Sequence, residues 1–200
     1  MPLRAYINGK EFISIDLPDD EWNNLKTELK SKKSVLTLPC CGQEGYLRIS
    51  RKGLKHFVHS KSACPCDWKH LKAKVAIIEA CRESGWEAVP EFSENDWRAD
   101  VLAVQGRKRI AFEVQWSRQS YEETRYRQAR YKESNVRGCW FFRIPSKEMT
   151  DYDKSLVADK DIPAFKIYKD EHSNIIAQVG QRQMPLKALA AALLLSLIHI

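Results

Sequence analysis

The sequence predicts an α/β protein whose mixed β-sheet is flanked by helices. Three observations lead to this prediction. Short apolar runs at residues 100–104 and 110–114 are joined by a polar turn, as in a β-hairpin. Residues 68–84 and 117–133, on either side of this hairpin in the chain, carry helix spacing and end signals. In the second of these segments Ser120 precedes Glu123 by three residues, as in a capping box at a helix start. The unbroken apolar run at residues 138–144 is typical of a central strand buried on both faces.

The part of the chain before this core is expected to hold two small modules. Asn8-Gly9 is a strong two-residue turn signal, and residues 19–32 carry acids in the first turn and bases in the last, as a helix does. The expected segments are a hairpin and helix at 1–33, a Cys- and His-rich, zinc-binding module at 34–67 and the main α/β domain at 68–169. They are followed by an apolar C-terminal segment at 170–200, which is interpreted as truncated.

Composition points to an anionic partner. The chain has 200 residues and a formal net charge of +7, which favours nonspecific attraction to polyanions. Basic residues are concentrated at 48–74 and 118–143, two runs that flank the hairpin and favour a phosphate-binding face. Four of the six cysteines cluster at 40–66, unlike a secreted disulfide framework, and no signal peptide opens the sequence. The apolar run at 188–200 is shorter than the roughly 20 residues of a membrane span. We expect a cytoplasmic protein without a membrane partner.

The hairpin carries two acids in unusual places. Asp100 begins its first strand, and Glu113 lies inside its second strand between apolar neighbours. Burying a lone carboxylate costs several kcal/mol, so Glu113 is expected to face solvent or a cation. Glu113 and Gln115 share one face of the strand, and Asp100 can approach them across the hairpin. Two carboxylates and a carboxamide oxygen suit a hard divalent cation such as Mg²⁺.

The cysteine cluster predicts a structural zinc site. Zinc takes four sulfur or nitrogen ligands, commonly from two turns separated by a hairpin. The chain offers more candidates than one ion needs: Cys40, Cys41, His56, His59, Cys64 and Cys66. Adjacent Cys40 and Cys41 are not expected to bind the same ion. The alternative interpretation is a set of reduced structural cysteines and solvated histidines.

An Asp, a strand and turn, and then Glu-x-Gln resemble the active-site hairpin of PD-(D/E)XK nucleases, with Gln115 where that superfamily usually has Lys. The surrounding sequence is more similar to the nuclease-like domain of the competence protein CoiA family. The similar segments are 98–101, 112–117, Arg127 with Tyr131, and 140–142. The resemblance implies a PD-(D/E)XK core, Mg²⁺ as cofactor, DNA as partner, and Asp100, Glu113 and Gln115 as catalytic residues. It also implies a Cys-rich turn before the nuclease-like part, and a further catalytic carboxylate from the preceding helix, for which Glu79 is the candidate.

The helix at 117–133 is the expected nucleic-acid-binding element, because guanidinium groups match phosphate oxygens and tyrosine rings stack on bases or pack beneath arginines. Its candidates are Arg125, Arg127, Arg130 and Tyr131. In contrast, Lys74 is interpreted as lying off the apolar stripe of the helix at 68–84. Glu91 is interpreted as a solvated residue of an edge strand at 86–92, where Pro90 indicates an edge or a bend. The alternative interpretation is that Glu91 faces the site.

Three functions follow from these observations. The first is a metal-dependent DNA nuclease linked to DNA uptake, processing or recombination. The second is a nucleic-acid-binding protein that keeps the nuclease fold without cleavage, since Gln115 supplies no positive charge. The third is an interaction module whose basic surface meets an acidic protein.

Overall fold

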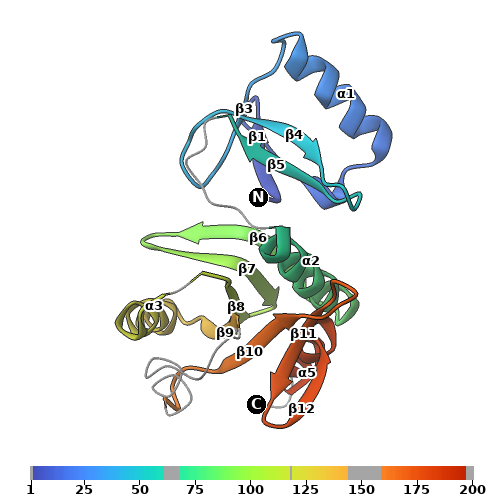
Figure 1. The fold of residues 1–200 in the computed structure, drawn as a ribbon. Coiled ribbons are helices and arrows are strands. Elements are labelled where there is room, and N and C mark those ends of the chain that lie inside the picture. The colour runs from blue at the N-terminus through green and yellow to red at the C-terminus, as the bar shows by residue number, and fades with distance from the viewer. Residues whose placement is uncertain (1, 61–67, 118, 144–158, 197–200) are drawn as a thin grey trace. The chain divides into compact units, whose positions relative to one another are not determined.

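The computed structural model describes residues 2–60, 68–117, 119–143 and 159–196 (Figure 1). The chain divides into two compact units, Met1–Leu71 and Lys72–Ile200. Each unit is built around its own β-structure.

The N-terminal unit combines two small sheets with one helix. Its elements are β1 (Arg4–Ile7), β2 (Lys10–Ile13), the 3-10 helix η1 (Ser14–Asp16), α1 (Asp19–Lys30), β3 (Leu36–Thr37), β4 (Gly45–Ile49) and β5 (Lys55–His59). One sheet has the order β2-β1-β3, and β4 pairs with β5 in the other. The predicted turn is confirmed: Asn8 and Gly9 have φ of 51° and 81°, the left-handed conformation that a two-residue hairpin turn requires.

A single hydrophobic core holds this unit together. Trp22 of α1 packs near Phe57 of β5, with ring centroids 5.8 Å apart. Leu36 and Leu38 are buried in the same cluster, together with Ala5 of β1. The segments predicted as separate modules at 1–33 and 34–67 therefore share one core.

The C-terminal unit is built on a mixed seven-stranded sheet. Its helices are α2 (Trp68–Glu83, whose first turn precedes the unit boundary), α3 (Tyr121–Glu133) and α5 (Leu186–Ser196). Its strands are β6 (Glu87–Glu94), β7 (Trp97–Gln105), β8 (Lys108–Gln115), β9 (Arg137–Arg143), β10 (Ala164–Lys169), β11 (Ile175–Val179) and β12 (Arg182–Pro185). The strand order is β12-β11-β10-β9-β8-β7-β6, with parallel pairing only between β8 and β9 and between β9 and β10. The predicted mixed sheet flanked by helices is confirmed.

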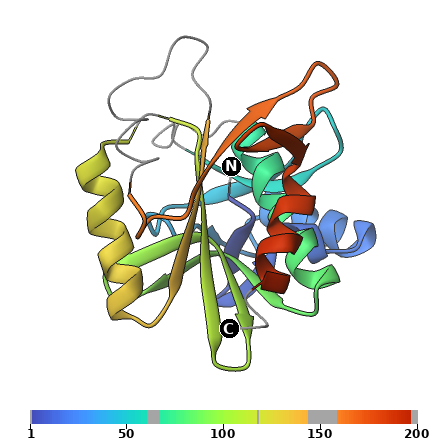
Figure 2. The ribbon, with the colours of Figure 1, turned by 90° about the horizontal axis from the view of Figure 1, so that it is seen from below.

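The helices cover both faces of this sheet. Figure 2 shows α3 on one face and α2 with α5 on the other. α3 connects the parallel strands β8 and β9, as a crossover helix does. Its predicted start is confirmed, because the Ser120 side chain accepts the backbone N–H of Glu123 at 3.1 Å. None of the helices in the described ranges has the length and hydropathy of a membrane span.

An aromatic cluster fills the space between the sheet and α3. Tyr131 of α3 meets Trp97 edge-on, with ring centroids 5.3 Å apart, and Trp140 at 6.2 Å. Gly138 of β9 allows this close packing: a Cβ there would lie 3.0 Å from the Tyr131 ring and overlap the end of the Gln128 side chain. The cluster fixes α3, and therefore Tyr131, against β7, β8 and β9.

Candidate functional site

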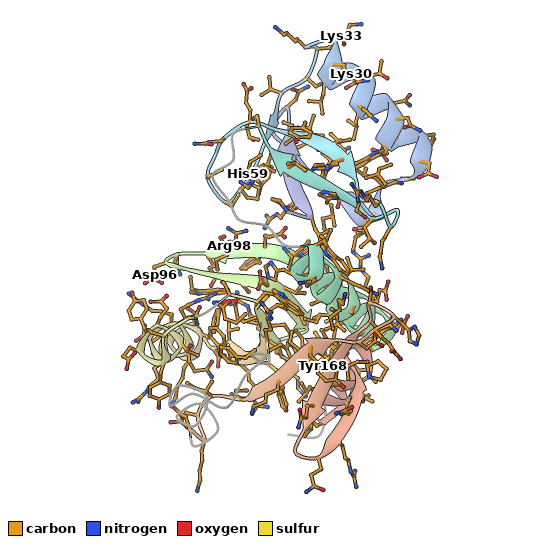
Figure 3. The ribbon with its side chains drawn as sticks, viewed as in Figure 1. Lys30, Lys33, His59, Asp96, Arg98 and Tyr168 are labelled. Carbon is orange, nitrogen blue, oxygen red and sulfur yellow. The ribbon has the colours of Figure 1, made fainter. Side chains whose placement is uncertain are left out.

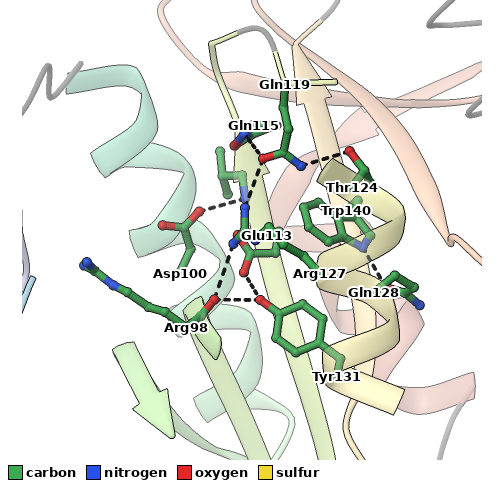
Figure 4. Close-up of polar contacts among 11 residues, drawn as sticks. Arg98, Asp100, Glu113, Gln115, Gln119, Thr124, Arg127, Gln128, Tyr131 and Trp140 are labelled. Atoms are coloured by element: carbon green, nitrogen blue, oxygen red, sulfur yellow. Dashed lines mark hydrogen bonds and ion pairs between the residues drawn. The ribbon is translucent and has the colours of Figure 1, made fainter. Parts of the chain in front are cut away.

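The strands β7 and β8 separate at Asp100. Their ladder ends where Val101 pairs with Phe112. One residue further along, the Asp100 carboxylate reaches across to β8 and accepts the backbone N–H of Val114 at 2.9 Å. Asp100 therefore takes the place of a ladder partner beside Glu113, its predicted neighbour (Figure 4).

Glu113 points from β8 toward α3 and is only 2% exposed. The Arg127 guanidinium lies 2.8 Å from its carboxylate, and the Tyr131 hydroxyl makes a short hydrogen bond to it. The same hydroxyl lies 2.7 Å from the backbone carbonyl oxygen of Arg98. The sequence predicts that Glu113 faces either solvent or a cation. In the structure it faces a cation, the Arg127 guanidinium of α3.

These partners do not fully compensate for the burial of Glu113. Burial and the nearby negative charge of Asp100 raise the pKa of Glu113 to about 7, although Arg127 and the Tyr131 hydroxyl act in the opposite direction. The single Tyr131 hydroxyl proton serves either the Arg98 carbonyl or the carboxylate, so a protonated Glu113 that donates to Tyr131 satisfies all three oxygens. Near neutral pH, Glu113 is present in both its ionised and neutral forms.

A chain of hydrogen bonds fixes how Gln115 is oriented. The Thr124 hydroxyl donates to the Ser120 carbonyl oxygen at 2.9 Å, so it accepts from Nε2 of Gln119. The Gln119 carbonyl oxygen then accepts from Arg127 at 3.0 Å and from Nε2 of Gln115. The amide nitrogen of Gln115 is thus committed to Gln119, and its carbonyl oxygen is the atom that the side chain offers elsewhere.

The donor set at this place fits a hard divalent cation. Two carboxylates, from Asp100 and Glu113, and the carbonyl oxygen of Gln115 are the oxygen ligands that Mg²⁺ prefers. The position of the Asp100 carboxylate beside buried Glu113 is the structural observation that supports this fit, since added positive charge there would offset the repulsion between the two acids. Each carboxylate oxygen has two lone pairs, so Glu113 keeps acceptor capacity beside its contacts with Arg127 and Tyr131.

Glu79, the acid expected from the preceding helix, has other contacts. Its carboxylate lies 3.4 Å from the Lys187 ammonium of α5 and is half-exposed. At 100° per residue, Glu79 is turned about 140° around α2 from Lys74, the α2 residue whose charge acts on Asp100. The structure places Asp100 beside Glu113 at the strand separation, with Gln115 two residues further along β8, and it places Glu79 beside α5.

The structure also separates the four predicted nucleic-acid contacts of α3. Tyr131 is 1% exposed and lies in the aromatic core, which corrects its expected role. Arg127 is half-buried against Glu113. Arg125 and Arg130 remain on the outer part of the helix, where Arg125 approaches Asp159 at 3.8 Å and Arg130 pairs with Asp96 at 2.6 Å. The exposed tyrosine of this helix is Tyr126, whose ring lies beneath the Arg130 guanidinium.

Sequence reasoning missed a buried ion pair next to Asp100. Lys74 of α2 and Glu91 of β6 are 3% and 1% exposed, and the Lys74 ammonium donates to the Glu91 carboxylate. Glu91 was expected to be a solvated edge residue, and β6 is indeed the edge strand of the sheet. The spacing contained a signal for Lys74, which is three residues after buried Leu71 and four before buried Ile78.

A second cluster of ligand-type side chains lies in the N-terminal unit. Among the described residues, one group of three Cys, His, Asp or Glu has all its ligand atoms within 4.8 Å: Cys40, Cys41 and His59. The two sulfurs are 3.8 Å apart, which is the separation of about 3.8 Å expected for two thiolates 2.3 Å from one tetrahedral zinc. The sulfurs of adjacent Cys40 and Cys41 thus lie at a separation that a shared ion allows. Figure 3 shows His59 at the end of β5.

The other zinc candidates are not part of this cluster as described. His56 faces the opposite side of β5 from His59 because side chains alternate, with the odd spacing of three residues between them. It is 1% exposed, its Nδ1 lies 3.1 Å from the Leu54 carbonyl oxygen, and burial lowers its pKa. Cys64 and Cys66 lie outside the described residues.

The sequence of the C-terminal unit matches a known protein family. Residues 68–184 match the family described as competence protein CoiA, nuclease-like domain. The match covers more than half of the chain and contains α2, α3, the strands β6 to β11 and all but the last residue of β12. No curated protein sequence matches this chain.

Proposed function

Because the chain belongs to the family of competence protein CoiA nuclease-like domains, we propose that it is a Mg²⁺-dependent DNA nuclease with a PD-(D/E)XK core, acting in DNA uptake, processing or recombination. One observation carries the proposal: the Asp100 carboxylate is bound to β8 beside buried Glu113, whose pKa is raised to about 7. Such a pair favours a divalent cation more than it favours water or a single protein cation.

Each residue of the site has a distinct role in this proposal. Asp100 and Glu113 hold the ion, and the carbonyl oxygen of Gln115 completes its protein ligands or orients the attacking water. Arg127 and Tyr131 keep the Glu113 carboxylate in place from α3. The chemistry that Mg²⁺ supplies when bound is polarisation of the scissile phosphate and a lower pKa for the attacking water.

The outer part of α3 is the proposed contact with DNA. Arg125 is 64% exposed, and Tyr126 is 55% exposed beneath Arg130. Guanidinium groups bind phosphate oxygens, and an exposed tyrosine ring offers a face to an unpaired base. Arg125 and Arg130 are therefore the two of the four predicted residues from which DNA binding is expected.

Zinc is the proposed occupant of the Cys40, Cys41 and His59 cluster, as the centre of a zinc-ribbon-like module. Two thiolates and one imidazole supply three of the four ligands of a structural site. The Cys40 sulfur and the His59 Nε2 are 2.9 Å apart, and they would separate to about 3.6 Å on a shared zinc. Its role is to join the β3–β4 loop to the end of β5.

A second candidate function is DNA binding without cleavage. The observation that favours it is Gln115, whose amide nitrogen is held by Gln119 and which brings no positive charge to the site. In that case the basic side chains of α3 supply the affinity, and Mg²⁺ has no effect on the DNA.

The test is DNA cleavage by the purified full chain in Mg²⁺, compared with chelator. We expect cleavage by the wild type, loss of cleavage in Glu113→Ala, and retained cleavage in the control Glu122→Ala, an exposed acid of α3. Retained cleavage in Glu113→Ala would contradict the proposed site. DNA binding that persists in chelator, without product in Mg²⁺, would favour the second candidate.

A further inference from the structure

A buried lysine and a buried glutamate lie on the α2 side of the candidate site. The Lys74 ammonium donates to the Glu91 carboxylate, and both side chains are almost fully enclosed. A buried ion pair is weak evidence for stability, because the loss of hydration can exceed the attraction between the charges. Its position beside Asp100 therefore calls for another explanation.

The backbone at Glu91 is the second observation. Glu91 has φ of 46°, in the left-handed region that non-glycine residues rarely adopt. In the ladder between β6 and β7, Pro90 pairs with Val101 and Phe92 with Ala99, which puts Glu91 opposite Asp100. A strained, buried carboxylate on an edge strand is typical of functional sites.

The charges of this cluster are coupled to Asp100. Burial alone would lower the pKa of Lys74, but the charges of Glu91 and Asp100 outweigh it and raise that pKa. Lys74 is therefore an ammonium ion that acts on both acids. The charge of Asp100 also acts on Arg127 of α3, so a cation on each face of the sheet interacts with this carboxylate.

We propose that Lys74, held by Glu91, supplies the nuclease site from α2 with a positive charge that Gln115 does not bring. This inference rests on the proposed function. Lys74 is a positioning residue that acts through Asp100: its ammonium, held by Glu91 opposite Asp100, balances the negative charge gathered at the strand separation. Besides Asp100, the Glu91 carboxylate neutralises the Lys74 ammonium, which allows this ammonium to stay buried.

This role differs from direct contact with the substrate. An ammonium that is 3% exposed does not reach a DNA phosphate, so its loss should lower kcat and leave KM unchanged. If the pair were merely structural, its loss would affect folding alone. Variants that still fold would then keep the wild-type kcat and KM.

The double variant Lys74→Gln/Glu91→Gln separates these roles. It removes both charges while keeping two polar side chains of suitable length to bond each other. We expect it to unfold at the same urea concentration as the wild type, with kcat lowered on the order of 100-fold and KM within threefold. Wild-type kcat in the folded double variant would overturn the inference and leave the proposed nuclease function standing.

Single variants keep the inference testable if the double variant does not fold. Lys74→Arg keeps the charge, and Lys74→Gln keeps only a hydrogen-bond donor. Most of the wild-type kcat should remain in Lys74→Arg and be lost in Lys74→Gln. Equal kcat in these two variants would overturn the inference. Lys72→Gln, which alters an α2 lysine bound to the Ser173 carbonyl oxygen, is the matched control.

Mn²⁺ binding measured by calorimetry tests the same coupling without any cleavage. Mn²⁺ is a hard ion that prefers carboxylates to the thiolates of Cys40 and Cys41. Glu91→Gln leaves an unbalanced ammonium beside Asp100 and should weaken Mn²⁺ binding about tenfold, whereas Lys74→Gln should strengthen it about tenfold. If the wild type binds Mn²⁺ but does not cleave DNA, the proposed function fails and the role of Lys74 in cleavage fails with it, whereas opposite shifts would still show that its charge acts on the ion site. Equal affinity in both variants, or no Mn²⁺ binding, would overturn the inference.

Discussion

The carboxylate of Asp100 is bound to the strand that carries Glu113, through the backbone N–H of Val114 at 2.9 Å. β8 is itself held between two neighbouring strands, so this hydrogen bond keeps the two carboxylates beside each other. Their repulsion contributes to the raised pKa of Glu113. The fold thus maintains a concentration of negative charge that protein cations only partly neutralise, and this is the feature on which a metal site depends.

Glu113→Gln should remove a pH dependence of stability. Since the folded-state pKa of Glu113 is raised from 4.5 to about 7, the folded protein binds this proton more tightly than the unfolded chain. The free energy of unfolding should therefore fall as the pH rises from about 4.5 to about 7, by about 3 kcal/mol for the full shift. Urea unfolding at pH 5 and pH 8 measures this. The decrease should be absent in Glu113→Gln and preserved in Glu122→Gln; an equal decrease in both variants would contradict the assignment.

Gln115→Lys should weaken metal binding, although it restores the residue usual in the nuclease superfamily. The new ammonium would lie beside Gln119, which already accepts from the Arg127 guanidinium, and it would replace an oxygen ligand. We expect Mn²⁺ affinity to fall on the order of tenfold. Calorimetry checks this, with Gln181→Lys in the exposed β11–β12 turn as control. Tighter Mn²⁺ binding by Gln115→Lys would show that Gln115 is not oriented as described.

Cys40→Ser should remove zinc from the purified protein. The Cys40 sulfur contacts both Cys41 and His59, so its replacement removes the central member of the cluster. We expect one zinc per chain in the wild type by elemental analysis, and loss of that zinc in Cys40→Ser. His172→Ala, which alters an exposed histidine of the other unit, should keep the metal. A wild type without zinc would end the zinc proposal.

Arg125→Gln/Arg130→Gln should weaken DNA binding and reduce its salt dependence. Each lost phosphate contact lowers the slope of log K against log salt by about 0.9 for duplex DNA. The control is the single variant Arg182→Gln, which removes the charge of an exposed arginine in β12. Fluorescence anisotropy over a salt series measures both slopes. An unchanged slope in the α3 variant would place the DNA contact on another surface.

Much of the fold follows from local sequence signals. Asn8-Gly9, the Ser120 cap and the apolar run of β9 each depend on a few adjacent residues, and each is found as predicted. The hairpin of β11 and β12 was missed. Its turn at Gly180 was a usable signal, but the burial of alternate residues in β11 depends on α5, which packs against that hairpin from later in the chain.

The site was predictable only in part, for a comparable reason. The alternation of side chains in β8 correctly separates Glu113 from Phe112, because period two is a property of any strand. The burial of Glu91 depends on a left-handed backbone at an edge strand, and the burial of Tyr131 depends on contacts with Trp97 and Trp140. These are tertiary features, and no local pattern in the sequence encodes them.

Anomalous diffraction from Mn²⁺-soaked crystals of the full chain tests the central claim most directly. If Asp100 and Glu113 share a divalent ion, an anomalous peak should lie between them, about 2.1 Å from a carboxylate oxygen of each. The peak should disappear in Asp100→Asn, which keeps an oxygen acceptor for the Val114 N–H but removes the charge. A fully occupied peak elsewhere, with none between Asp100 and Glu113, would contradict the account.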